Sequence, residues 1–107
     1  MTPVWSALQA ARDDYATGGT TGWRTCGIHL RQALTDWETA QKLDTGKGIA
    51  DKKTFTKDQR LDNLRYHVRE FTHIAGHPDP NVAKTWTRDD ALLALSTTCA
   101  LLNTKKP

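Results

Sequence analysis

The chain has 107 residues and a formal net charge of +3 with its four histidines neutral. Hydrophobic residues make up 37% and charged residues 25% of it, a balance typical of a soluble globular protein. No apolar run approaches the roughly 20 residues that span a bilayer, and the mildly basic charge permits an acidic partner without requiring one.

The sequence also predicts a compartment. The N-terminus, MTPVWSALQAARDDY, lacks the basic segment and following apolar segment of a secretory signal, so we expect a cytoplasmic protein. Cys26 and Cys99 each lie in an apolar helical pattern. We therefore expect two small, buried and reduced side chains, with a disulfide as the alternative.

The first two predicted helices lie near 3–17 and 21–43. Thr2 and a proline at the first helical position favour the start of the first helix, and a Gly-Gly pair ends it. Gly27, inside the second helix, suggests a close helix crossing. Apolar residues of the second helix recur at steps of three and four, which predicts one buried stripe: Trp23, Cys26, Leu30, Ala33, Trp37 and Ala40.

A basic loop is predicted at 44–55, and two further helices near 57–76 and 88–103. Thr56 and Thr87 stand at N-cap positions, the first in a capping-box pattern. Two more stripes with steps of three and four follow: Leu61, Leu64, Val68, Phe71 and Ala75, and then Leu92, Leu95, Cys99 and Leu102. The sequence therefore predicts an all-α, single-domain four-helix bundle over 1–107.

The segment 65–78, RYHVREFTHIAGHP, holds three of the four histidines. Tyr66, Glu70, His73 and His77 share the face opposite the buried stripe, with Arg69 beside them. His73 and His77 are spaced to chelate one ion from a helix. The alternative, which we favour, is a solvated face, and we expect no metal or other cofactor.

An arginine and a histidine, in that order and on the same side of one predicted helix, form a candidate site for metal-independent RNA cleavage. Arg60 and His67 are seven residues apart, so that an arginine could stabilise phosphorane charge and a histidine act as acid or base. The alternative is that the arginine pairs with an acid while the histidine packs at the edge of the core.

Two further kinds of binding surface are indicated. Basic side chains on the second helix and in the loop predict a phosphate-binding surface, or else only a charged, soluble face: Arg24, Arg31, Lys42, Lys47, Lys52 and Lys53. Trp5 and Trp86 lie off the strongest stripes, so they either anchor a partner protein or close the ends of the core.

Three segments resemble the small helical bundles of HEPN type, a group that overlaps with domains found near abortive-infection proteins. They are WRTCGIHLRQALTDW, LRYHVREFTHIAGHP and WTRDDALLALSTTCALLN, within 21–103. The resemblance implies a helical homodimer, and in catalytic members an arginine, a polar residue and then a histidine. Arg60 and His67 match that spacing, whereas Leu61 stands where the polar residue is expected.

We therefore expect a small, non-catalytic HEPN-like binding or regulatory module that engages a protein or RNA partner. Phage defence, a toxin–antitoxin pair or phage–host interaction is the expected setting. The alternative is a metal-independent endoribonuclease that uses Arg60 and His67. The candidate binding residues are Tyr66, Arg69, His73, His77 and Trp86, with the basic residues named above.

Overall fold

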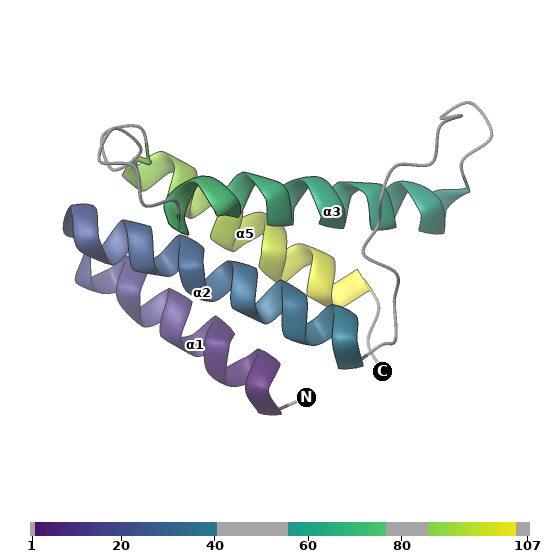
Figure 1. The fold of residues 1–107 in the computed structure, drawn as a ribbon, viewed down its shortest axis with the longest axis horizontal. Helices are drawn as coiled ribbons and strands as arrows, with labels where there is room; N and C mark the ends of the chain where they lie inside the picture. The colour runs from purple at the N-terminus through teal and green to yellow at the C-terminus, as the bar shows by residue number, and fades with distance from the viewer. Residues whose placement is uncertain (1, 41–55, 77–85, 105–107) are drawn as a thin grey trace.

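A computed structural model describes residues 2–40, 56–76 and 86–104 of the chain. Within these ranges it contains only helices, which confirms the all-α four-helix bundle (Figure 1). The helices are α1 (Thr2–Thr17), α2 (Gly19–Ala40), α3 (Lys57–Gly76) and α5 (Arg88–Thr104). The predicted bounds agree to within two residues wherever the structure describes the chain. The predicted end of the second helix, 41–43, lies outside the described residues.

The helix ends follow from local chemistry that the sequence already displays. Thr56 accepts a hydrogen bond from the Gln59 N–H at 3.2 Å, and its own N–H donates to Oε1 of Gln59 at 2.8 Å. The Thr87 N–H donates to Oδ2 of Asp90 at 2.9 Å, and the Asp90 N–H donates to Oγ1 of Thr87 at 3.3 Å. Each reciprocal pair satisfies N–H groups that a helix start leaves open, so both predicted caps are confirmed.

Successive helices run in opposite directions, and α2 packs against each of the other three (Figure 1). The turn between α1 and α2 is short because Gly18 and Gly19 both adopt positive φ, 77° and 74°. α5 also contacts both α1 and α3. None of the helices in the described ranges has the length and apolar character needed to cross a bilayer.

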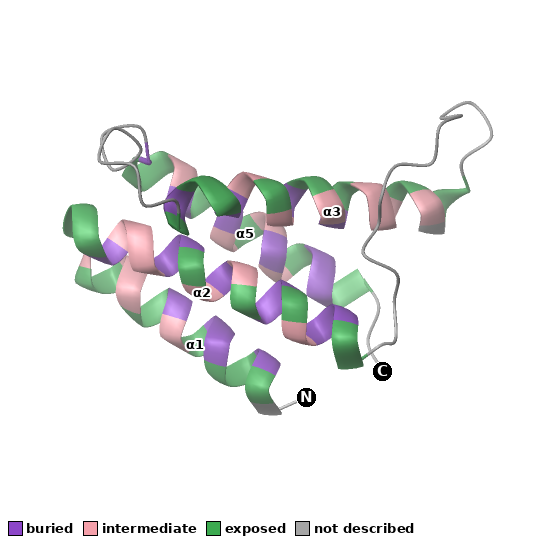
Figure 2. Cartoon of the chain, in the orientation of Figure 1, coloured by how far each residue is buried: buried purple, intermediate pink, exposed green. Residues whose placement is uncertain are grey.

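Buried residues lie on the inward sides of the helices (Figure 2). The stripe predicted for α2 is confirmed at Cys26, Leu30, Ala33 and Trp37, all buried. Other large hydrophobic side chains buried in the core are Val4, Leu8, Leu34, Val68, Leu101 and Leu102. Three predicted core residues instead face outward: Ala40 is exposed, Leu64 is 46% exposed and Leu92 is 42% exposed.

Trp86 closes one end of the core. A Cβ added at Gly27 would lie 2.5 Å from Ala75 Cβ and 2.8 Å from the Trp86 ring, so glycine permits the predicted close crossing of α2 and α3. Trp86 is 3% exposed and its indole N–H donates to the Trp23 carbonyl at 2.7 Å. The interpretation of Trp86 as an exposed anchor is therefore wrong, because the gap at Gly27 accommodates its ring.

Candidate functional site

Three charged residues of α2 contact α3, and one of them, Glu38, is buried. Arg24, Arg31 and Glu38 are spaced by seven, close to two helical turns, so they share one side of α2. Arg24 Nε donates to the Ala75 carbonyl at 2.8 Å, and Nη1 of Arg31 contacts Nδ1 of His73. The two arginines expected on an outer phosphate-binding face thus lie at the seam between α2 and α3.

Glu38 forms the buried end of this seam. Its Oε1 lies 2.6 Å from Nη1 of Arg65 and 3.4 Å from Nε of Arg69. Glu38 is 5% exposed and Arg65 is 4% exposed. A buried charge costs free energy unless an opposite charge pairs with it, so Glu38 and Arg65 each depend on the other for stability. Sequence analysis missed this pair. The signal that could have indicated it is an acid, Glu38, on the same side of α2 as two arginines, together with Arg65 and Arg69 four residues apart on α3.

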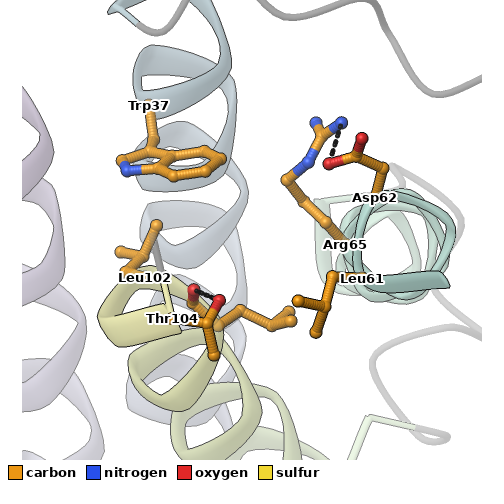
Figure 3. Close-up of a pocket in the computed structure, with 7 residues that line it drawn as sticks. Trp37, Leu61, Asp62, Arg65, Leu102 and Thr104 are labelled. Atoms are coloured by element: carbon orange, nitrogen blue, oxygen red, sulfur yellow. Dashed lines mark hydrogen bonds and ion pairs between the residues drawn. The ribbon is translucent and has the colours of Figure 1, made fainter. Parts of the chain in front are cut away.

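A small cavity beside this ion cluster is no substrate site (Figure 3). Asp62 and Arg65 of α3 face Trp37 of α2 across it, and the end of α5 closes it. Nη2 of Arg65 lies 3.8 Å from Oδ1 of Asp62. The cavity has room for about one water molecule, so it is too small to bind a ligand.

The predicted polar face of α3 makes contacts within the protein. The Arg69 guanidinium lies over the Tyr66 ring at 5.5 Å, and Arg69 Nη2 lies 3.8 Å from Oε1 of Glu70. The contact with Arg31 occupies one of the two ring nitrogens of His73. Across the described part of the chain, no three side chains of metal-binding type come together. His77, Lys42 and the lysines of the predicted loop, Lys47, Lys52 and Lys53, lie outside the described residues.

The fourth histidine joins α1 to α2. His29 Nδ1 lies 2.5 Å from Oδ2 of Asp14, an interaction that sequence analysis did not anticipate. Asp14 also lies near Cys26, and burial first, then this carboxylate, raises the pKa of the Cys26 thiol to about 11. Cys26 is buried and Cys99 is half-buried, and both are free thiols. A thiol with so high a pKa is a packing group and not a nucleophile.

Arg60 and His67 share the exposed side of α3 that their spacing predicts. The His67 ring packs edge-on against Tyr66, with centroids 5.3 Å apart. His67 also lines a hollow between α3 and α5, whereas Arg60 does not. Of this pair, the structure thus brings only His67 to the edge of a helix–helix hollow.

This hollow, here named the α3–α5 hollow, has a volume of about 230 Å³. Val68 and Ala94 form its buried floor, while Leu64 and Leu93 stand at its rim, 46% and 59% exposed. Its lining contains one histidine and no aspartate, glutamate, lysine or arginine: Leu64, His67, Val68, Phe71, Leu93, Ala94 and Thr97. Exposed leucines beside an apolar hollow are typical of a docking surface.

Comparisons with known proteins found no similar protein. The chain matches no family model, no curated protein and no solved structure. The resemblance to HEPN-type bundles therefore stays a prediction.

Proposed function

We propose that the chain is a small, non-catalytic HEPN-like binding module that engages a protein partner through the α3–α5 hollow. The observation that carries the proposal is the pair of half-exposed leucines, Leu64 and Leu93, at the rim of an apolar hollow. Two large aliphatic side chains in water on either side of an apolar floor gain free energy when a partner covers them.

The form of the surface favours a helical partner. The walls of the hollow are helical: α3 contributes Leu64, His67 and Phe71 at helical spacing, and α5 contributes Leu93 and Thr97. A groove between two helices accepts the apolar face of a third, whose anchors are spaced by three, four and seven residues. The predicted homodimer belongs to this proposal, since a second copy is itself a helical protein.

A nucleic-acid partner has less support. Affinity for nucleic acid depends on cationic side chains that reach phosphates. Arg24 and Arg31 are engaged at the α2–α3 seam, and the hollow is lined by no lysine or arginine. The nucleic-acid hypothesis then depends on the loop lysines, which the structure does not describe.

Site-specific photo-crosslinking in the cells that make the protein tests the docking surface. A benzophenone amino acid replaces Ser96, exposed on α5, and in a matched variant Ser6, exposed on α1. We expect a discrete covalent adduct from position 96 that disappears when Leu93→Lys is added, and none from position 6. Absence of an adduct at position 96, or one that survives Leu93→Lys, would contradict the proposal.

An endoribonuclease is the second candidate, supported by the shared side of Arg60 and His67 and by the place of His67 at the hollow. Purified protein is incubated with structured and single-stranded RNA in chelator, beside the double variant Arg60→Ala/His67→Ala. The binding-module proposal predicts no cleavage in either sample. Cleavage by the wild type that the double variant loses would overturn it in favour of catalysis.

A further inference from the structure

The α2–α3 seam has more basic than acidic side chains. Its basic residues come from both helices: Arg24 and Arg31 of α2, and Arg65, Arg69 and His73 of α3. Glu38, its buried acid, faces the arginines of α3 at one end. Towards the other end, α2 contains no acidic residue from Gly19 to Thr35, and α3 contains none from Phe71 to Gly76. The end of the seam around Arg31 and His73 therefore has no acidic residue on either of its helices.

Arg24 has a partner that suits its charge, whereas Arg31 does not. Arg24 donates to the Ala75 carbonyl in the last turn of α3, where helix carbonyls carry partial negative charge. Arg31 is half-buried, and its guanidinium contacts a nitrogen of the His73 ring. No carboxylate of the described residues pairs with Arg31. A neutral ring occupies one N–H of the guanidinium and leaves its positive charge uncompensated.

We propose that Arg31 and His73 form a binding site for a small, doubly charged oxyanion such as inorganic phosphate. Arg31 is always charged and offers its donors in a planar fork that suits oxyanions. When the anion binds, His73 takes up a proton from the solvent at Nδ1, so that the nitrogen that accepts from Arg31 becomes a second donor. Two positive charges then face the two negative charges of the anion. The site lies between α2 and α3, so it is independent of the α3–α5 hollow.

A protonated His73 meets another cation across the seam. Arg31 faces it from α2, and Arg69 lies one turn before it on α3. Glu70, the nearest acid along α3, is exposed, and its Oε1 lies 3.8 Å from Nη2 of Arg69. α5, which also packs on α3, carries its charged side chains in its first turn: Arg88, Asp89 and Asp90. An anion between Arg31 and His73 supplies the missing negative charge, so anion binding and protonation of His73 favour each other.

Sulfate titrations of the labelled chain at pH 6 and pH 8 test the site. Sulfate is doubly charged at both pH values, so any pH dependence of its binding comes from the protein. The carbon-bound ring protons of His73 report binding by NMR, with the ionic strength held constant by sodium chloride. At pH 6 we expect saturation with a dissociation constant on the order of millimolar, as a few charge-assisted hydrogen bonds give. At pH 8 the affinity should be at least about tenfold weaker, because each anion binds together with one proton.

Two arginine variants separate a specific site from general attraction to a basic protein. Arg31→Gln removes the proposed donor, and Arg12→Gln removes the same charge from an exposed arginine of α1. At pH 6, Arg31→Gln should weaken sulfate binding at least about tenfold, and Arg12→Gln less than about twofold. The ring signals of His29, whose partner is the Asp14 carboxylate, should not respond to sulfate. Circular dichroism of both variants should match the wild type, since neither arginine pairs with a carboxylate of the described residues.

The wild type alone can overturn the inference: His73 signals that show no saturable response to sulfate would do so, as would binding as tight at pH 8 as at pH 6. An equal loss of affinity in Arg12→Gln and Arg31→Gln would also contradict it. Dimethyl phosphate carries one negative charge, as a nucleic-acid phosphate does, and should bind at least about tenfold more weakly than sulfate. Equal binding of the two anions would contradict a site for two negative charges.

Discussion

Replacing Glu38 by glutamine tests the buried ion cluster between α2 and α3. Its carboxylate lies 2.6 Å from Arg65 and 3.4 Å from Arg69, and glutamine keeps the volume while removing the charge. Breaking a buried pair by neutralising one member costs about 3–5 kcal/mol. Arg65 and Arg69 keep acidic neighbours, Asp62 and Glu70, each at 3.8 Å, so the lower end, about 3 kcal/mol, is expected.

A loss of that size is easily measured. For a domain of about 100 residues, each kcal/mol shifts Tm by roughly 4 °C or more, so Glu38→Gln should melt at least about 12 °C below the wild type. Glu70→Gln is the matched control: its side chain is 45% exposed, and exposed ion pairs contribute less than about 1 kcal/mol. Urea unfolding of the wild type and both variants compares their free energies of unfolding. If Glu38→Gln is no less stable than Glu70→Gln, the reasoning about the cluster is refuted.

Two further predictions concern the core. Gly27→Ala should lower the free energy of unfolding by about 1–3 kcal/mol in urea, because its Cβ would lie 2.5 Å from Ala75 Cβ; an unchanged midpoint would contradict the close crossing. Thiol labelling of Cys26 should rise about tenfold per pH unit from neutral pH towards its pKa of about 11, because only the thiolate reacts. Fast labelling of Cys26 at pH 7 would contradict its burial beside Asp14.

Helix starts and periodicity could be predicted because they depend on nearby residues. The caps at Thr56 and Thr87 need only partners three residues away, and both form as expected. Repeats of three and four residues likewise place side chains on one face of a helix. They do not say whether a neighbouring helix covers that face. Leu64 and Leu92 follow their stripes and remain exposed, because the packing of α3 and α5 leaves those positions open.

The candidate site was harder to predict because it depends on which helices become neighbours. Seven-residue spacing places Arg24, Arg31 and Glu38 together, but only the approach of α3 makes that side a seam instead of a solvent face. Trp86 precedes its helix, so periodicity says nothing about it; the space above Gly27 decides its burial. The side shared by Arg60 and His67 followed from spacing alone, whereas the hollow beside His67 requires both α3 and α5.

An NMR dilution series of the labelled chain tests most directly that the α3–α5 hollow is the docking surface at which the predicted homodimer forms. On dilution through the micromolar range, amide signals of Leu64, Val68, Leu93 and Thr97 should shift together along one dimerisation isotherm. The Trp5 indole N–H signal, from an exposed residue of α1, should stay fixed. Signals of the hollow that do not move, or a Trp5 signal that moves in their place, would contradict the account.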